Sequence, residues 1–250
     1  MKALITGASS GIGRDMARIL SDKGFDLILV GRNIEKLNEL KKELNSNIKI
    51  ITMDLNVLEN CIRLHDENPN IDLLINNAGF GDCGDFTTTS LDKEINMINT
   101  NIVAYHTLTK LYLIDMKKLN HGHILNVASI AGFMPGPLMS TYYSTKAYVV
   151  RLSEGIREEL KKEKSKVKIS ILCPGPVNTN FNNVANVSFS LKSLSSEYVA
   201  NYALSHLNKF YIIPGFSIKC LKFISHIIPS SLLSKAVYNT QKKKIDTNNK

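Results

Sequence analysis

The sequence predicts one α/β domain built on a doubly wound parallel sheet, followed by a C-terminal helical extension. Short runs rich in Ile, Leu and Val alternate with longer stretches of helical periodicity. Runs such as Leu27–Val30 are apolar at every position, as expected for strands that helices cover on both faces. The length of 250 residues, 44% of them hydrophobic, suits a single domain of this class.

The expected elements follow one another in strict alternation. Six short apolar runs are expected to be strands: Lys2–Thr6, Asp26–Val30, Ile48–Thr52, Ile71–Asn76, His123–Ala128 and Val167–Cys173. Six longer stretches with helical spacing of apolar residues are expected to be helices: Ile12–Lys23, Asn33–Leu44, Val57–Glu67, Leu91–Leu119, Tyr142–Glu163 and Ser195–Asn208. The chain shows no internal repeat and no low-complexity linker, which fits one domain.

The positive charge of the chain is concentrated near its C-terminus. Lys and Arg number 31 against 22 Asp and Glu, for a net charge of +9. From residue 192 onward the sequence has nine lysines, and its only acids there are Glu197 and Asp246. No basic patch interleaved with aromatic residues accompanies these lysines, so nucleic-acid binding is not expected.

Neither the cysteines nor the N-terminus indicates secretion. The four cysteines are far apart and include no CxxC pair, which argues against a disulfide framework and against a metal site. Met1 and Lys2 run directly into the first strand and leave no room for a signal peptide. Lysines and prolines interrupt Phe210–Leu233, the most apolar stretch, so it is too broken for a spanning helix. We therefore expect a cytoplasmic protein.

A ligand site is expected beyond the carboxyl ends of the strands, where doubly wound sheets bind their ligands. The segment after the first strand, Thr6–Gly13, is rich in glycine and opens a helix, so its backbone can approach a pyrophosphate at the positive helix end. Because the spacing is G-x-x-x-G-x-G, an ordinary glycine-rich connection is the alternative. The candidate cofactor ligands in this segment are Gly7, Ser9, Ser10, Gly11, Ile12 and Gly13.

The end of the second strand indicates which dinucleotide binds. Dinucleotide sites usually carry an acid about 20 residues past the glycines, where it binds the ribose 2′-hydroxyl. Arg32 lies at this place, and an arginine can pair bidentately with a 2′-phosphate. NADP(H) is therefore favoured over NAD(H), with a solvated surface arginine as the alternative. Asp54 and Leu55, after the third strand, are candidates to flank the adenine, unless Asp54 is only a helix cap.

Tyr142 and Lys146 are the candidate proton-transfer pair. Their i, i+4 spacing places them one turn apart on the same face of a helix. A phenol with an ordinary pKa near 10 needs a pKa lower by roughly three units to act near neutral pH, which is about 4 kcal/mol. A cation about 4 Å away supplies a stabilisation of that size. Taken alone, such a pair is more often an ordinary surface pair.

Further candidates lie near the middle strands. Ser129 ends the fifth strand, where its hydroxyl can hydrogen-bond a substrate carbonyl or serve only as a turn serine. Asn77, Ala78 and Gly79 follow the fourth strand, either beside the cofactor or as a simple turn. Asn101 lies within a predicted helix, where asparagine is unfavourable; it either marks a kink that holds a water or is a tolerated polar residue.

In this order and on these strand ends, the motifs resemble the short-chain dehydrogenase/reductase family, whose domain is a Rossmann fold, over about Lys2–Phe181. The resemblance implies that the glycine turn binds the nucleotide, that Asp54 and Leu55 adjoin the adenine, and that 77–79 stabilise the sheet beside the cofactor. It also implies a catalytic tetrad formed by Asn101, Ser129, Tyr142 and Lys146. Tyr142 and Lys146 would contact the cofactor as well.

The segment after the sixth strand also resembles that of the family. In Pro174-Gly175-Pro176-Val177-Asn178-Thr179, the resemblance places the Val177 backbone and the Thr179 hydroxyl near the nicotinamide carboxamide. Pro174 and Gly175 are further implied cofactor contacts. Substrate specificity is expected in the loop Asn180–Ser195 and in the C-terminal segment.

The activity implied by the resemblance is hydride transfer between the nicotinamide of NADP(H) and a carbonyl or hydroxyl group of an apolar small molecule, such as a ketone, an acyl compound or a steroid-like compound. Tyr142 would give or take the proton on oxygen, and Ser129 would orient that oxygen. Lys146 would lower the pKa of the tyrosine and hold the ribose, and Asn101 would seat a water. Two alternatives stay open: a non-catalytic NADP(H)-binding sensor or scaffold, and a 3-oxoacyl-thioester reductase.

The C-terminal region departs from the common pattern of the family because a V-D-G-G type ending is missing. Phe210–Gly215 is expected to be a substitute last strand, so we divide the chain into a Rossmann-type domain at 1–213 and an extension at 214–250. Phe216–Tyr238 resembles the extension of long-chain acyl or hydroxysteroid reductases. A homo-oligomer is expected, a dimer rather than a tetramer, paired through the helices around Leu91–Leu119 and Tyr142–Glu163.

Three interpretations of the extension are open. It can form a lid over an apolar substrate pocket, it can be an amphipathic patch that contacts an anionic membrane peripherally, or it can be a solvated terminal helix. The polar, lysine-rich stretch Lys242–Lys250 is expected to be disordered in each case.

Overall fold

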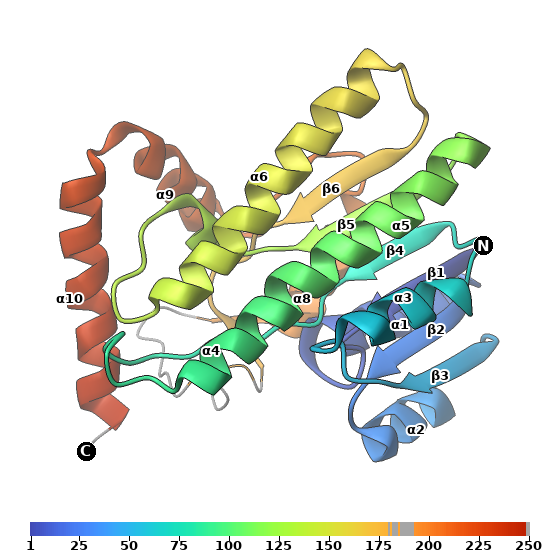
Figure 1. Ribbon diagram of the computed structural model, residues 1–250, viewed down its shortest axis with the longest axis horizontal. Coiled ribbons are helices and arrows are strands. Elements are labelled where there is room, and N and C mark those ends of the chain that lie inside the picture. Colours follow the sequence, from blue (N-terminus) through green and yellow to red (C-terminus); the bar gives the residue numbers. More distant parts are fainter. Residues whose placement is uncertain (180, 182–184, 186–192, 249–250) are drawn as a thin grey trace.

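The computed structural model describes residues 1–179, 181, 185 and 193–248, and in the last helix it describes side chains as far as residue 242. The main sheet of this described part has seven strands in the order β3-β2-β1-β4-β5-β6-β9, and every neighbouring pair is parallel (Figure 1). The strand order reverses between β1 and β4, which confirms the predicted doubly wound α/β sheet.

Each of the six expected strands that alternate with helices lies within two residues of its predicted bounds. The strands of the main sheet are β1 (Lys2–Thr6), β2 (Asp26–Gly31), β3 (Ile48–Thr52), β4 (Leu73–Asn76), β5 (His123–Val127), β6 (Lys168–Leu172) and β9 (Tyr211–Ile212). The substitute last strand is thus only two residues long. A small second sheet, which pairs β7 (Val177–Asn178) with β8 (Leu194–Ser195), was not expected, because strands of two residues carry no periodic pattern.

The helices also follow the predicted order. They are α1 (Gly11–Asp22), α2 (Ile34–Glu43), α3 (Leu58–Asp66), α4 (Leu91–Ile98), α5 (Ala104–Leu119), α6 (Ser140–Lys162), α8 (Ser196–Ser205), α9 (Phe216–Ile227) and α10 (Ser230–Asn248). Two short helical turns join them, the π-helical turn η1 (Asn99–Val103) and the 3-10 turn η2 (Ile130–Phe133).

Two expectations about the helices were wrong. Leu91–Leu119 is not one regular helix, because the π-helical turn separates α4 from α5. The lysine-rich end is not irregular either, since α10 continues to Asn248. Lysine and glutamine are good helix formers, so a polar composition alone does not end a helix.

Both faces of the sheet are buried, as the continuous apolar runs require. Along β1, Ala3 and Ile5 pack with α1, α2 and α8, whereas Leu4 packs on the opposite face with α3 and α5. In β2, Leu29 and Val30 divide between the same two clusters. Each such fully buried aliphatic side chain contributes about 1.5–3 kcal/mol relative to an exposed one.

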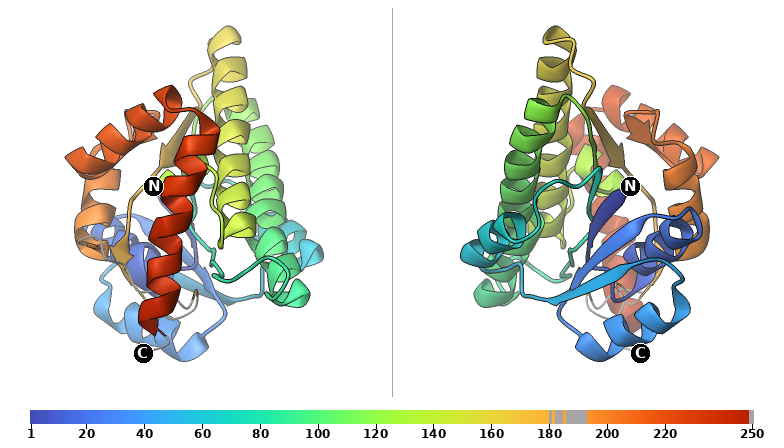
Figure 2. Two further views of the ribbon diagram at one scale, coloured as in Figure 1. Left: turned by 90° about the vertical axis from the view of Figure 1, so that its left-hand side faces the viewer. Right: turned by 90° about the vertical axis from the view of Figure 1, so that its right-hand side faces the viewer.

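The two C-terminal helices lie at one end of the molecule. Figure 1 shows α9 and α10 at the end toward which the strands of the sheet point, and the left view of Figure 2 shows α10 as the helix nearest the viewer. Because ligands bind beyond the carboxyl ends of parallel strands, these helices are placed beside the expected site. None of the helices in the described part of the chain is long and apolar enough to cross a membrane.

His123, at the start of β5, makes the fold sensitive to acid. Its Nε2 lies 2.9 Å from the hydroxyl oxygen of Ser170 on β6. Burial, together with the charge of Lys168, lowers the pKa of His123 from 6.5 to about 4. The unfolded chain therefore binds a proton below about pH 6.5 that the folded chain does not accept until about pH 4, so stability falls as the pH falls through this range.

The expected loss from His123 is up to about 3 kcal/mol. Urea unfolding of the protein and of His123→Gln at neutral pH and near pH 4 measures this loss, because the variant lacks the titrating group. The variant is expected to lose less stability than the unmodified protein. Equal losses in the two proteins would show that another group is responsible.

Candidate active site

One cleft of about 1180 Å³ lies at the carboxyl ends of the strands. The segments that follow β1 to β6 line one side of it, and α9 and α10 line the other. With two exceptions, every site residue predicted from the sequence lines this cleft. The exceptions are Gly13 and Asn101, both of which are buried. Most of the loop 180–195, where specificity was expected, lies outside the described residues. Among described residues there is no cluster of three or more His, Cys, Asp or Glu side chains that could hold a metal ion.

The turn between β1 and α1 needs its glycines for steric reasons. Gly7 has a φ of +66°, and a Cβ atom there would lie 2.8 Å from the Cα of Ala78. A Cβ at Gly13 would lie 2.6 Å from the carbonyl oxygen of Gly7 and 2.5 Å from the side-chain nitrogen of Asn77. The turn is therefore closely packed against the end of β4, which leaves its outer side for the cleft.

Thr6 holds this turn to the end of β4. The Thr6 hydroxyl accepts hydrogen bonds from the backbone N–H groups of Asn77 (2.9 Å) and Ala78 (3.0 Å). The side-chain amide of Asn77 donates to the carbonyl oxygens of Thr6 and Gly7 at 3.0 and 3.2 Å. Asn77, identified from the sequence as a candidate, thus fastens two strand ends together, and Thr6 is its partner.

The start of α1 fits an anionic group. Ser10 is the N-cap residue, yet its side chain makes no capping hydrogen bond within the described structure, and the first turn contains no acid. The leading N–H groups of the helix therefore face the cleft side without an internal partner. Such a helix end, where Ser10, Gly11 and Ile12 line the cleft, suits the phosphates of a dinucleotide.

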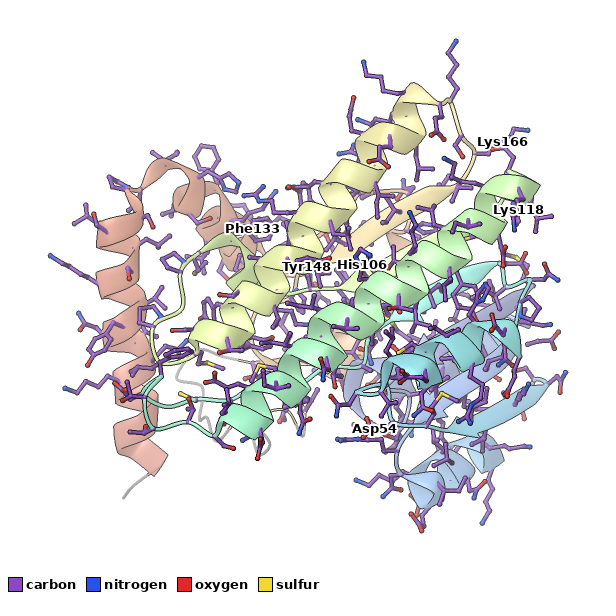
Figure 3. All side chains as sticks on the ribbon, in the orientation of Figure 1. Asp54, His106, Lys118, Phe133, Tyr148 and Lys166 are labelled. Carbon is purple, nitrogen blue, oxygen red and sulfur yellow. The ribbon has the colours of Figure 1, made fainter. Side chains whose placement is uncertain are left out.

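Arg32 follows β2 directly and lies on the cleft with its side chain exposed. Arg14, a neighbouring arginine, instead pairs with Glu43 at 3.7 Å and does not line the described cleft. Asp54 and Leu55 line the same end of the cleft (Figure 3 labels Asp54). The Asp54 carboxylate accepts a hydrogen bond from the backbone N–H of Asn56 at 3.0 Å, so it also shapes the turn before α3.

Tyr142, Ser129 and Lys146 converge in the middle of the cleft. Tyr142 and Lys146 lie one turn apart near the start of α6, and Ser129 follows β5. The Ser129 hydroxyl accepts from the N–H of Ala131 at 3.1 Å and is hydrogen-bonded to Tyr142. Lys146 is buried and donates to the carbonyl oxygen of Val127 at 3.0 Å.

The electrostatics of this trio differ from the sequence expectation. The Lys146 ammonium lies 5.9 Å from the centroid of the Tyr142 ring. Burial raises the pKa of Tyr142 above its usual value, and the hydrogen bond with Ser129 only partly opposes this effect. Burial also lowers the pKa of Lys146 to about 8. In this state the phenol is therefore held protonated, because desolvation outweighs the nearby cation.

Asn101 lies in the π-helical turn η1 and is fully buried. Its side-chain nitrogen donates to the Phe80 carbonyl at 2.9 Å and to the Thr145 hydroxyl at 3.1 Å. Its side-chain oxygen accepts from the Phe80 N–H at 3.1 Å. The irregularity expected at this asparagine is a π bulge, a feature that often marks functional sites. Asn101 thereby ties the segment after β4 to the catalytic helix, next to Lys146.

The segment after β6 also lines the cleft, and it contacts both the glycine turn and α9. Pro174, Gly175, Val177 and Thr179 line it, and the Thr179 methyl group lies 3.0 Å from where a Cβ of Gly11 would be. This contact brings the end of β6 to the glycine turn. A Cβ at Gly175 would lie 2.5 Å from the Cδ1 of Ile218, so α9 packs directly on this segment.

Sequence analysis did not identify the individual residues that line the cleft opposite the strand ends. We call this part of the lining the far wall. The Tyr143 hydroxyl accepts a hydrogen bond at 2.7 Å from the Gln241 side-chain nitrogen, although 98 positions separate the two residues. Gln241 is buried, and its side-chain oxygen has no hydrogen-bond partner among described residues. No local pattern links such distant positions. The apolar residues of this wall are Met134, Met139, Phe181, Ile218, Leu221, Leu233 and Val237.

Comparison with known protein families gives one matching family. The family described as short chain dehydrogenase matches residues 1–188. An uncharacterized oxidoreductase of Staphylococcus epidermidis is 32% identical over 216 residues, which cover 82% of this chain and 93% of that protein. The NADP-dependent 3-hydroxy acid dehydrogenase YdfG of Escherichia coli (strain K12) is 35% identical over 190 residues, 74% of this chain and 76% of its own length.

Solved structures give the same result for the whole fold. A short-chain dehydrogenase from Sphingobium yanoikuyae, solved in complex with NADPH, superposes with a TM-score of 0.82 at 27% sequence identity. The match covers 93% of this chain and 95% of that chain.

Proposed function

This chain belongs to the short chain dehydrogenase family, and on that premise we propose that it reduces the carbonyl group of an apolar substrate with hydride from NADPH. As a member of this family it is an NAD(P)-dependent oxidoreductase that acts on CH–OH or C=O groups. The observation that carries the proposal is the convergence of Ser129, Tyr142 and Lys146 at one point of the cleft.

In the proposed reaction, the residues of this chain either transfer a proton or hold the reacting groups in position. NADPH, when bound, supplies the hydride for the carbonyl carbon. Tyr142 donates its phenolic proton to the carbonyl oxygen, and the positive charge of Lys146 opposes the burial that raises the pKa of this phenol. Ser129 orients the same oxygen by a hydrogen bond. Lys146 holds the ribose and adds positive charge behind Tyr142, and Asn101 lies on the route by which a water returns the proton.

Arg32 is proposed to select NADP(H) by pairing with the 2′-phosphate. Its exposed side chain lines the cleft at the end of β2, where an acid would favour the 2′-hydroxyl of NAD(H). The NADPH in the structure from Sphingobium yanoikuyae and the NADP dependence of YdfG agree with this preference. Gly7–Gly13, Asp54, Leu55, 77–79 and the segment 174–179 are proposed to hold the rest of the cofactor.

Replacing Arg32 with Asp is expected to invert the cofactor preference. The change removes charge-assisted hydrogen bonds worth about 1.5–3 kcal/mol and adds repulsion, so the ratio of NADPH to NADH affinity should fall by about 100-fold or more. Fluorescence titration with each cofactor measures the ratio. Arg63→Asp on α3 changes the net charge equally, away from the cleft, and should leave the ratio unchanged. An unchanged ratio in Arg32→Asp would show that this arginine does not select the cofactor.

The substrate is proposed to be an apolar ketone, acyl or steroid-like compound, because the wall formed by α9 and α10 is largely apolar. The 3-oxoacyl-thioester reductase and the non-catalytic sensor remain the alternatives. Following NADPH oxidation with medium-chain ketones, ketosteroids, 3-oxo acids and 3-oxoacyl thioesters distinguishes them. Turnover of thioesters alone would favour the first alternative. Tight NADPH binding without any turnover would favour the second.

The division of the chain and its assembly are proposed on the same basis. Residues 1–213 form the catalytic domain, and 214–250 form an extension that walls the substrate end. We propose a homodimer through the outer faces of α5 and α6. On these faces His106 and Tyr148 point toward each other and are 2.8 Å apart, between Nδ1 and the hydroxyl oxygen (Figure 3).

A further inference from the structure

The outward face of α9 and of the turn into α10 carries large apolar side chains in solvent. Phe216 is 81% exposed, Phe223 is 68% exposed and Ile227 is 65% exposed. We call this surface the α9 face. Its residues are Phe216, Phe223, Ile224, Ile227, Ile228 and Leu232. In the left view of Figure 2, α9 lies at the left edge of the molecule and α10 lies in front of the rest of the chain.

The α9 face is a stripe with helical periodicity and not a scatter of single residues. Phe216, Phe223 and Ile227 are spaced i, i+7 and i+11, so they share one side of α9. The inner side of the same helix is apolar as well, since Ile218 packs into the core and Leu221 lines the cleft. The inner stripe is thus covered by the domain, whereas nothing in the described chain covers the outer one. Helices that are apolar on both sides are normally buried on both.

The charged side chains of α9, and those of α10 as far as residue 245, are all lysines. The sequence has no acidic residue from 198 to 245. Lys219 and Lys235, both exposed, lie on α9 and α10. Lys222 is half-buried, and its ammonium lies over the rings of Tyr211 and Phe133, 3.4 and 5.0 Å from their centroids (Figure 3 labels Phe133). The exposed lysines on α9 and on the first turns of α10 are therefore Lys219 and Lys235.

This charge pattern indicates which kind of partner can bind the α9 face. A second copy of the chain docked through the same face would place lysines against lysines without any acid, which is unfavourable. An anionic lipid surface satisfies both features, because Phe and Ile side chains enter the acyl boundary while lysines reach the headgroups. Since no described helix can span a bilayer, the helix would lie in the plane of the interface.

We propose that the α9 face docks this protein on an anionic lipid surface. The lipid contact comes from the outer stripe and from Lys219 and Lys235, and it leaves the inner stripe of α9 free to form the cleft wall. Docking requires only the exposed apolar side chains of the α9 face and the charges of its lysines, so it does not depend on which substrate the cleft binds. If the proposed reaction is correct, the docked helix places the apolar wall of the cleft beside the lipid.

Sedimentation of the full-length protein with vesicles tests the proposal. Binding is expected to vesicles of equal parts phosphatidylcholine and phosphatidylglycerol, and it should weaken at high salt and on vesicles of phosphatidylcholine alone. The double variant Phe223→Ser/Ile227→Ser should lose at least about 10-fold in partitioning, because both side chains leave the acyl boundary. Lys219→Gln/Lys235→Gln should weaken binding only to the anionic vesicles.

The matched control is Phe86→Ser/Leu91→Ser, which removes two equally exposed apolar side chains far from α9 in the sequence. It should bind vesicles like the unmodified protein, and NADPH titration of all variants checks that the cleft is intact. No sedimentation with anionic vesicles, or equal losses in the control and the α9 variant, would overturn the proposal. A dimer in light scattering that Phe223→Ser/Ile227→Ser converts to monomer, without vesicle binding, would overturn it in favour of a second copy.

Discussion

Replacing Tyr142 with Phe is expected to lower the rate of carbonyl reduction by about 1,000-fold, because the variant lacks the proton that the carbonyl oxygen must receive. The phenol is buried and its pKa is raised, so no solvent proton replaces it readily. The ring itself stays, and with it the packing against Phe181, whose centroid is 5.2 Å away. Affinity for NADPH should therefore change little. Stopped-flow measurement of NADPH oxidation, with NADPH titration beside it, gives both quantities.

The neighbouring tyrosine provides the matched control. Tyr143→Phe also removes one hydroxyl from the same helical turn, but that hydroxyl is hydrogen-bonded to Gln241 on α10. Its loss removes one hydrogen bond, worth about 1 kcal/mol, and should affect substrate KM more than kcat. Near-normal turnover by Tyr142→Phe, or equal losses of kcat in both variants, would contradict the role proposed for Tyr142.

Replacing Gly13 with Ala is expected to destabilise the protein by about 1–3 kcal/mol and to weaken dinucleotide binding. The new Cβ would lie 2.6 Å from the Gly7 carbonyl oxygen and 2.5 Å from the Asn77 side-chain nitrogen, both of which are fixed by hydrogen bonds. The turn must shift, and the start of α1 shifts with it. Thermal unfolding should show a Tm lower by about 2–4 °C for each kcal/mol lost, and NADPH titration should show the loss of affinity.

Gly155→Ala, in the exposed middle of α6, makes the same chemical change with the opposite expected sign. Nothing lies within 4 Å of a Cβ at Gly155. Alanine is favoured over glycine within a helix by about 0.5–1 kcal/mol, so this variant should be more stable than the unmodified protein. A fall in Tm for both variants, or for neither, would contradict the steric account of the glycine turn.

The central strands could be predicted from the sequence because their signal is local. Leu27–Val30 is apolar at every position, and in the structure those side chains divide between two buried clusters, one on each face. The two-residue strands β7 and β8 carry no such signal, and of the expected strand Phe210–Gly215 only the two residues of β9 form. They exist because neighbouring segments offer backbone hydrogen-bonding groups, as when Cys173 donates to Ile212 at 2.8 Å.

In the candidate site, too, some features follow from local sequence patterns and others depend on the tertiary structure. The glycine turn, the position of Arg32 and the Tyr142–Lys146 spacing are local patterns. Arg32, Tyr142, Lys146 and most residues of the turn line one cleft. The spacing of Tyr142 and Lys146 shows that a cation lies near the phenol, but it does not show how deeply the two groups are buried. Burial turned out to be the larger influence on the pKa of both Tyr142 and Lys146.

By itself, the sequence determined the class of the sheet, the order of its elements and the chemical types brought to the strand ends, because periodicity and turn chemistry act over a few residues. Only the tertiary structure decided which side of α9 faces the cleft and which side faces solvent, and that Gln241 meets Tyr143. The C-terminal helices are apolar on more than one side, so their own composition allows several orientations. Packing of Ile218 against Gly175 and the core selects one of them, and this choice leaves the α9 face exposed.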